Sequence, residues 1–551
     1  MNATQAEPDS ARLRLVIAAS AIGTVFEWYD FFIYGTLGTI LPRTFFAAGN
    51  PTLEVLLFWL VFAVGFGVRP LGAALFGFLG DRLGRRATFL ATVGMMGVAT
   101  AGVGFVPPAS SIGYAAPALV VFLRVAQGLA LGGEYGGAAI YVAEYCRPGR
   151  RGFYTSFIQA GVAGGFILSL LVVLGCKAAF GFEAWAAWAW RIPFVLSLGL
   201  LAISLWLRLR LVESPVFEAM KAHHQVAGNP LAECIRTPGN RKGMLVALFG
   251  VAAGLTVIWY TAMFGSLAFL KTAMRLDETA AEVIVGVAAL FAVGGFLLFG
   301  YVSDKVGRKG PIVWGYLATL VLLFPLYWAM GGLANPGLAA QARELPVVVS
   351  GPDCRFDPFT PEQPTRCARL LSDLTATGVS YRVERADELT LHAGAARLLL
   401  DTYPWGDGRR GRVVALEALL AQGGYHFDRI VPSAGRAVLL VLVLVVLMGL
   451  SGATYGPVAA TLCEMFPPRI RYSSLSIPYH LGTGLFGGFL PFLSTLIVVR
   501  TGDPYAGLWY TWCVVALALV VSLWGLRNGM PGEDAGQADE RQADGAAPLS
   551  A

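Results

Sequence analysis

Charged residues are scarce in this chain of 551 residues, in which Asp, Glu, Lys and Arg together make up 14%. Soluble domains carry about 25% charged residues, so a soluble protein of several domains is excluded. Hydrophobic residues reach 56%, and the mean hydropathy is +0.62. The composition therefore places the chain in a membrane.

Features that other classes of protein need are also missing. The net charge is only +6, and the basic residues gather in alternate loops, so binding to nucleic acid is not needed to explain them. No constellation of metal ligands or nucleophiles lies at membrane depth, which argues against a membrane enzyme. We expect no catalytic residue, no metal, no cofactor and no nucleic-acid partner.

A cleavable signal peptide is not evident either, because the apolar run after Arg14 continues well past the length of a signal core. About 20 residues at roughly 1.5 Å each cross the hydrocarbon layer of a bilayer. The sequence predicts twelve transmembrane helices, at 15–41, 53–79, 87–106, 115–143, 154–176, 190–211, 243–270, 282–302, 311–333, 435–461, 472–498 and 505–527.

The loops after the even-numbered spans carry most of the Lys and Arg residues, and such loops stay in the cytoplasm. Both termini are therefore expected inside, in a multi-pass protein of the inner membrane. The chain then divides into a cytoplasmic N-terminus (1–14), a six-helix bundle (15–211), a central cytoplasmic loop (212–242), helices 7 to 9 (243–333), an extracytoplasmic insert (334–434), helices 10 to 12 (435–527) and a cytoplasmic tail (528–551).

The insert is polar and holds two of the seven cysteines, Cys354 and Cys367. An oxidising exterior favours a disulfide between them, although two free thiols in a loose loop remain the alternative.

Two loop motifs recur six spans apart. The stretch "GDRLGRR" at 80–86 matches "SDKVGRK" at 303–309, and "EYCRPGRR" at 144–151 matches "EMFPPRIR" at 464–471. Basic loops in general do not share an Asp-x-x-Gly-Arg register. The repeats therefore indicate an all-α membrane protein of two related six-helix bundles.

With these loops, the stretches "EWYDFFIYG", "RPLGAALFGFLGDRLGRR" and "RVAQGLALGGEYGGA" resemble the major facilitator superfamily, and within it the metabolite:proton symporters for α-ketoglutarate, citrate, shikimate, and proline or betaine. The resemblance implies the fold of that superfamily, with alternating access and protons as the coupling ion. It also implies a latch on the inner side, formed by Gly80, Asp81, Gly84, Arg85, Arg86, Asp304, Gly307, Arg308 and Lys309. The insert departs from the usual short loop, and the tail lacks the coiled coil of the osmosensing branch.

Charged residues inside the apolar helices need a reason, because each costs at least about 2.5 to 3.5 kcal/mol to insert. The sequence places Glu27 and Asp30 on one face of the first helix, Arg69 on the second, and Arg124 and Glu134 on the fourth. We expect the acids and the arginines to neutralise one another. Asp30, Glu27 and Glu134 are then candidates for proton coupling, and Arg69 and Arg124 for binding a substrate carboxylate. Fixed ion pairs that only set packing are the alternative.

Polar and aromatic residues are further candidates for the pocket. Tyr34 lies on helix 1 together with Tyr29, Gln159 lies on helix 5, and Trp259 and Tyr260 lie on helix 7. Plain packing is the alternative for each of them, and His480 fits a hydrogen-bonded structural role better than a proton relay. The glycine-rich runs at 131–137 and 482–488 allow close helix approach and bending.

We expect a monomeric symporter in the lipid bilayer that imports protons with a small organic acid, such as a dicarboxylate, a tricarboxylate or a shikimate-like acid. A zwitterionic osmolyte such as proline or betaine is the alternative substrate. A membrane sensor that uses the insert for recognition is the alternative from another class, although such a sensor would need an output domain on the inner side.

Overall fold

Long apolar helices make up most of the chain, as their composition requires, because a helix satisfies its own backbone hydrogen bonds in lipid. The structure is a computed structural model that describes residues 10–46, 50–83, 85–208, 230–237, 239–360, 363–467 and 470–527. Within these ranges, eleven helical stretches are long and apolar enough to cross a membrane. The twelfth expected span is also helical, with a shorter apolar stretch at Leu90–Phe105. The predicted all-α class is confirmed.

The N-terminal half of the bundle contains α1 (Ser10–Thr36), α2 (Leu41–Phe45), α3 (Pro51–Gly67), α4 (Arg69–Leu83), α5 (Arg85–Phe105), α6 (Ala109–Ile112), α7 (Ala115–Gly132), α8 (Tyr135–Tyr145), η1 (Pro148–Arg150), α9 (Arg151–Ala187), η2 (Ala189–Arg191) and α10 (Ile192–Arg208). The C-terminal half contains α12 (Pro230–Arg236), α13 (Asn240–Leu245), η3 (Val246–Ala252), α14 (Ala253–Tyr260), η4 (Thr261–Gly265), α15 (Ser266–Ala268), η5 (Phe269–Ala273), α16 (Glu278–Val306), α17 (Lys309–Ala334), α21 (Ala434–Tyr455), α22 (Val458–Met465), α23 (Arg471–Gly482), η6 (Thr483–Gly488), α24 (Leu490–Thr501) and α25 (Leu508–Gly525).

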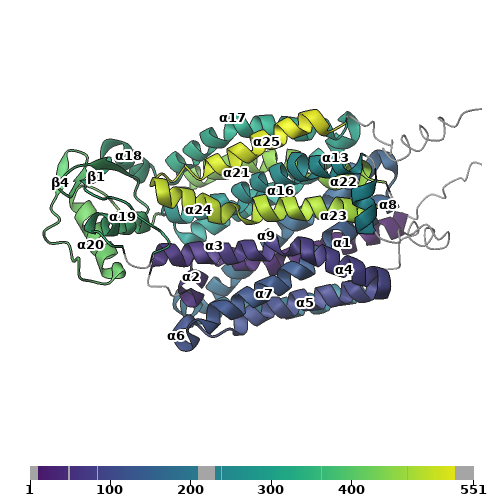
Figure 1. The fold of residues 1–551 in the computed structure, drawn as a ribbon, viewed down its shortest axis with the longest axis horizontal. Helices are drawn as coiled ribbons and strands as arrows, with labels where there is room; N and C mark the ends of the chain where they lie inside the picture. The colour runs from purple at the N-terminus through teal and green to yellow at the C-terminus, as the bar shows by residue number, and fades with distance from the viewer. Residues whose placement is uncertain are drawn as a thin grey trace, which may run out of the picture.

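The two halves lie side by side with their helices along the long axis of the molecule, and the insert sits at one end (Figure 1). We call this the insert end and the opposite one the far end. The most extensive contact between the halves joins α9 to α16. The two helices approach closely at Gly300, where an added Cβ would lie only 2.6 Å from the Ser156 side chain. Small residues thus allow the halves to pack tightly.

Several spans are interrupted within the membrane. The second span breaks at Val68 between α3 and α4, and the fourth breaks at Gly133 and Glu134 between α7 and α8. The seventh span contains the π-helical segments η3, η4 and η5, and the eleventh contains η6. The glycine-rich runs at 131–137 and 482–488 therefore coincide with irregular backbone. Such irregularities often mark functional sites in transporters.

The insert is a folded unit with its own sheet and core. It contains α18 (Pro336–Glu344), β1 (Val347–Gly351), α19 (Arg366–Thr377), β2 (Tyr381–Arg385), β3 (Thr390–Ala393), β4 (Ala396–Leu398) and α20 (Arg409–Gln422). The strand order is β2-β1-β3-β4, with β1 and β2 parallel across the connecting α19. Its buried core is separate from that of the bundle and includes Val349, Leu371, Leu391 and Leu420.

In the structure, Cys354 and Cys367 are joined by a disulfide that fastens the start of α19 to the loop after β1. We expect peptide mapping without reductant to recover these two cysteines in one linked fragment. Closing a loop of this length stabilises a domain by about 3 kcal/mol in the chain-entropy model, so a double Ser variant should melt earlier. Cys513, an exposed free thiol, is the positive control for alkylation. Alkylation of Cys354 and Cys367 under the same conditions would contradict the bond.

Candidate functional site

Two buried arginines of the N-terminal half pack against the same aromatic ring, that of Phe31. Arg69 is the first residue of α4, and Arg124 lies on α7; their exposed fractions are 1% and 0%. The Arg69 guanidinium carbon lies 4.6 Å from the centroid of Phe31, and that of Arg124 lies 4.0 Å from it. Arg69 also packs 3.6 Å from the ring of Phe66. Aromatic faces thus partly compensate the two buried positive charges.

The two arginines lie close together because α3, α4 and α7 approach to backbone contact. A Cβ added at Gly128 would overlap the carbonyl oxygen of Gly65, and one at Gly132 would overlap that of Arg69. Only glycine therefore allows this crossing. The break at Val68 then directs Arg69 from the second span toward Arg124.

The guanidinium of Arg124 has a fixed orientation on one side. Its Nη1 donates to Oε1 of Gln127 at 2.7 Å and to the carbonyl oxygen of Phe31 at 3.4 Å, and Gln127 Nε2 donates to Thr100 Oγ1 at 2.8 Å. Among the described residues, Nε and Nη2 of both Arg69 and Arg124 have no hydrogen-bond acceptor. Four guanidinium nitrogens, which carry six N–H groups, are thus available to an anion.

Asp30 is a buried carboxyl group of the same half. It lies on α1, is 5% exposed, and interacts electrostatically with Glu134, which is 2% exposed and lies at the break between α7 and α8. Glu27 is 8% exposed, one turn before Asp30. No ion pair in the described part of the chain joins Asp30 to Arg69 or Arg124. The predicted neutralisation of Asp30 by these arginines is therefore wrong, because aromatic side chains take the places next to the guanidinium groups.

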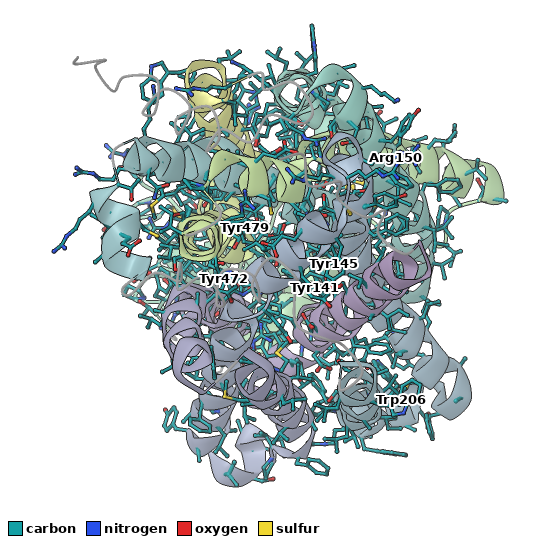
Figure 2. All side chains as sticks on the ribbon, turned by 90° about the vertical axis from the view of Figure 1, so that its right-hand side faces the viewer. Tyr141, Tyr145, Arg150, Trp206, Tyr472 and Tyr479 are labelled. Carbon is teal, nitrogen blue, oxygen red and sulfur yellow. A yellow bond between two sulfur atoms is a disulfide. The ribbon has the colours of Figure 1, made fainter. Side chains whose placement is uncertain are left out.

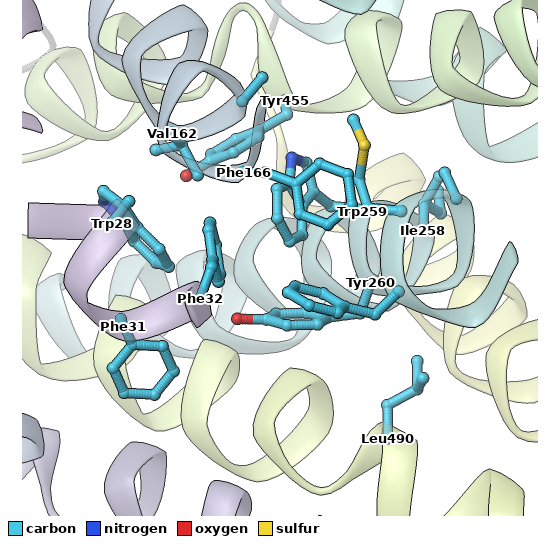
Figure 3. Packing of buried hydrophobic residues seen from close by; sticks show 14 of the residues in the cluster. Trp28, Phe31, Phe32, Val162, Phe166, Ile258, Trp259, Tyr260, Tyr455 and Leu490 are labelled. Carbon is cyan, nitrogen blue, oxygen red and sulfur yellow. The ribbon is translucent and has the colours of Figure 1, made fainter. Parts of the chain in front are cut away.

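Aromatic residues from both halves meet on the insert side of the arginines. Trp259 of α14 stacks on Phe32 of α1, with ring centroids 4.9 Å apart, and Tyr260 packs edge-on against Phe66 at 5.5 Å. Figure 3 shows Phe32 of α1 and Phe166 of α9 near Trp259 and Tyr260 of α14. Trp259 Nε1 and the Tyr260 hydroxyl have no hydrogen-bond partner among the described residues. Both predicted helix 7 residues therefore reach the interface between the halves.

The predicted helix 1 tyrosines lie in different places. The Tyr34 ring lies 4.6 Å from the Arg124 guanidinium carbon and stacks on Phe58. Tyr29 instead donates its hydroxyl hydrogen to the carbonyl oxygen of Pro193 at 2.6 Å, within the N-terminal half. Only Tyr34 of the pair is therefore placed to take part in the arginine site.

A second group of polar rings closes the site toward the far end. Tyr135 of α8 stacks on Tyr479 of α23 with centroids 4.0 Å apart, and Gln159 Nε2 donates to the Tyr135 hydroxyl at 3.0 Å. Seen from the far end, Tyr479 lies where the two halves meet (Figure 2). Both ring nitrogens of the buried His480 lack a hydrogen-bond partner within the described ranges. The hydrogen-bonded structural role expected for His480 is therefore not observed.

The space between these two aromatic groups is small. A cavity of about 10 Å³ is lined by Trp28, Phe66, Tyr260, Tyr455 and Tyr479, among others. One water molecule needs about this much space, so an organic acid does not fit. The structure is therefore closed around the site, and the halves must separate before a substrate enters.

At the far end, Asp304 connects the halves. Its carboxylate accepts hydrogen bonds from the backbone N–H groups of Gly152 and Phe153, both at 2.8 Å, at the N-terminus of α9. Arg308 holds the same carboxylate at 2.7 Å and pairs with Glu464 at 2.9 Å. A carboxylate at a helix N-terminus is favoured by the helix dipole as well as by the hydrogen bonds.

The other predicted latch residues have less direct contacts. Gly307 ends α16 with a φ of 89°, which favours glycine, and Lys309 Nζ donates to the carbonyl oxygen of Leu523. Gly80, Asp81, Gly84, Arg85 and Arg86 lie outside the residues whose side chains the structure describes.

The structure adds site residues that the sequence analysis did not select. Phe31 packs against both arginines, Gln127 orients Arg124, and Tyr135, Tyr455 and Tyr479 form the far wall. Gln127 could have been found, because it lies one turn after Arg124 in "RVAQG" and so shares its helix face. The tyrosines carry no such signal, since an aromatic residue on an apolar helix usually only packs.

Residues 20–349 match the Major Facilitator Superfamily. A glycine betaine/proline/ectoine/pipecolic acid transporter of Dickeya dadantii is 34% identical over 336 residues, which cover 58% of this chain and 65% of the transporter. The shikimate transporter of Escherichia coli is 34% identical over 326 residues, or 58% and 73% of the two chains. The inner membrane metabolite transport protein YhjE of the same organism is 36% identical over 322 residues, or 57% and 71%.

Solved structures of the same fold include the D-xylose-proton symporter, with a TM-score of 0.57, 16% identity, and coverage of 94% of this chain and 99% of that one. A double tryptophan mutant of XylE gives a TM-score of 0.61 at 15% identity, with coverage of 97% and 99%. At this level of identity the likeness concerns the fold alone.

Proposed function

The chain belongs to the Major Facilitator Superfamily and is a multi-pass membrane transporter, not an enzyme, and from this premise we propose that it takes up a small organic acid together with protons. The observation that carries the proposal is the pair of buried arginines with unused N–H groups. Guanidinium binds carboxylate in a bidentate, charge-assisted geometry, so an organic anion supplies what these groups lack.

Two arginines favour a substrate with two acidic or strongly polar ends over one with a single carboxylate. Arg69 and Arg124 come from different helices, and each has N–H groups without an acceptor among the described residues, so they offer two binding points. Trp259 Nε1 and the Tyr260 hydroxyl add donors from the C-terminal half. A di- or tricarboxylate, or a hydroxylated acid such as shikimate, matches this set, and its binding draws both halves onto one ligand.

Proton coupling is assigned to Asp30 and Glu134. Two carboxyl groups that lie close together in a buried site tend to share one proton, because both charges together are unfavourable there. Asp30 directly precedes Phe31, the ring that both arginines contact, so an anion at the arginines and a proton at Asp30 act on the same turn of α1. Substrate and proton are thus expected to enter and leave together.

A zwitterionic substrate is the second candidate, because one relative is named as a glycine betaine and proline transporter. A quaternary ammonium group would need free aromatic faces. Arg69 already lies over Trp28, Phe31 and Phe66, and Trp259 is stacked on Phe32. The aromatic faces next to the arginines are therefore occupied, which favours the organic acid.

We also propose that both termini are cytoplasmic, that the insert is extracytoplasmic, and that the transporter is a monomer in the inner membrane. The support is the distribution of Lys and Arg, which gather in the loops at the far end.

Uptake into proteoliposomes tests the function. With an inward pH gradient, we expect accumulation of one or more labelled acids from a panel of di-, tri- and hydroxycarboxylates, with slower equilibration when the gradient is abolished. A panel of betaine, proline and ectoine serves as the comparison. Accumulation of these zwitterions without any acid would replace the proposed substrate class, and accumulation that ignores the pH gradient would exclude proton coupling.

A further inference from the structure

A buried ion cluster joins the halves at the insert end. Lys177, on the extended C-terminal part of α9, places its Nζ 2.8 and 2.9 Å from the two carboxylate oxygens of Glu282 on α16. Lys271 Nζ lies 2.6 Å from Oε1 of the same carboxylate. The three side chains are between 2% and 12% exposed. One carboxylate therefore binds a lysine from each half.

The cluster can separate without leaving any of these charges alone. Lys271 and Glu282 both belong to the C-terminal half, so Glu282 keeps a cation when α9 moves away. Lys177 lies 5.7 Å from the ring centroid of Trp185 on its own helix, so it keeps an aromatic face. Removing one partner of a buried ion pair is normally unfavourable because the other charge stays unpaired. This arrangement avoids that penalty, as a contact that opens and closes in each cycle requires.

The insert is fastened to the C-terminal half beside this cluster. Backbone hydrogen bonds link Ile430 to Arg275 and Asp277, and Arg429 pairs with Glu278 at 3.2 Å. Arg275 also donates to the carbonyl oxygens of Phe427 and Thr377 and pairs with Glu417 at 2.8 Å. These contacts follow directly on η5 and precede α16, so the insert must move with the segment that carries Lys271 and Glu282.

The hydrogen bonds of the insert with the N-terminal half are fewer, and Arg409 also interacts electrostatically with the buried Glu54 of α3. Arg409 Nη2 donates to Thr52 Oγ1 at 2.9 Å, and Asn50 Nδ2 donates to the carbonyl oxygen of Thr360 at 3.1 Å. Both contacts fall at the N-terminus of α3. The insert thus spans the two halves, with a firm attachment on one side and a lighter one on the other.

We propose that Lys177, Glu282 and Lys271 form the gate at the insert end, and that the insert moves with the C-terminal half and holds this gate closed through its contact with α3. The inference concerns the regulation of the same site, so it rests on the proposed transport function. Opening the gate breaks the contact of Lys177 with Glu282 and that of Arg409 with Thr52, and leaves the attachments within the C-terminal half intact.

Distances between spin labels test the gate without any transported substrate, so failure here is distinct from failure of the proposed function. Labels go on cysteines that replace Tyr114 at the start of α7 and Val438 on α21, which are 95% and 60% exposed and lie in different halves near the insert end. The background carries Cys513→Ser, which removes an exposed free thiol. The label distance of the full-length protein in nanodiscs is measured by electron double resonance.

Lys177→Met should populate a longer distance that is rare in the parent protein, and Thr52→Val should do the same to a smaller extent. Lys271→Met is the matched control: it removes an even more buried lysine from the same carboxylate but leaves the contact between the halves, so the short distance should persist. The proposal is overturned if Lys177→Met leaves the distribution unchanged, or if both lysine variants lengthen it equally. A Thr52→Val distribution identical to the parent would remove the insert from the gate.

Discussion

Asp30→Asn is expected to abolish the accumulation of substrate that a pH gradient drives, while exchange of substrate between the two sides of preloaded vesicles continues. The amide has the shape of a protonated carboxyl group but neither gains nor loses a proton. Asp30 is buried, and Glu134 is its charged neighbour, so a fixed neutral group at this position also ends the sharing of a proton with Glu134. The transporter should then move substrate only down its own gradient.

Glu27→Gln is the matched control for this prediction. Glu27 lies one helical turn from Asp30 on the same face of α1 and is similarly buried, so it matches Asp30 in chemistry and burial. We expect Glu27→Gln to keep most of the coupling and Glu134→Gln to lose much of it. Gradient-driven uptake and exchange measured on all three variants decide the point, and full accumulation by Asp30→Asn would leave Asp30 a structural role only.

Substrate binding should weaken by roughly ten- to a hundredfold when either buried arginine is replaced with lysine. A charge-assisted hydrogen bond contributes about 1.5 to 3 kcal/mol, and lysine keeps the charge and the contact with Phe31 but loses the planar pair of N–H donors. Because Arg69 and Arg124 each have free donors, the double variant should bind more weakly than either single variant. Calorimetric titration of the acid identified by uptake gives the dissociation constants.

Gln127→Leu distinguishes the orientation of the Arg124 guanidinium from the direct contact of that guanidinium with the substrate. Gln127 accepts from Arg124 Nη1, while the free N–H groups of that arginine point elsewhere, so the variant should weaken binding less than Arg124→Lys does. Melting temperatures of all variants check that the bundle is intact. Equal affinity of Arg124→Lys and the parent protein would show that the substrate does not use this guanidinium.

The sequence was sufficient to predict the elements that depend on composition. The twelve spans follow from apolar length, and the repeated loops predict two related halves. Charges in apolar helices also identified Asp30, Arg69, Arg124 and Glu134, because burying a charge is unfavourable wherever it occurs. All four are buried in the structure.

What the sequence could not predict depends on rotamers and on contacts far apart in the chain. Helical periodicity does not show that two arginines would pack against Phe31 instead of pairing with Asp30. The α9 helix was expected to end at Cys176, because Lys177 follows the apolar run, but it continues to Ala187 with a kink at Gly181. Lys177 lies in this extension and pairs there with Glu282. The length of an apolar segment does not indicate which residue such a lysine pairs with. The polar composition of the insert likewise gave no indication of its four-stranded sheet.

The pairing of α9 with α16 has a kinetic consequence. Glu282 and Asp304 lie 22 residues apart on α16, about 33 Å along a helix, and each binds α9 or its N-terminus. Contacts at both ends of the same pair of helices therefore stabilise the state that is closed on both sides. The lifetime of this closed intermediate depends on the summed free energies of the two contacts. A substitution that tightened either end would deepen this intermediate and slow turnover in both directions. Selection for fast transport would accordingly limit the strength of both contacts, even where a stronger pair would make the folded protein more stable.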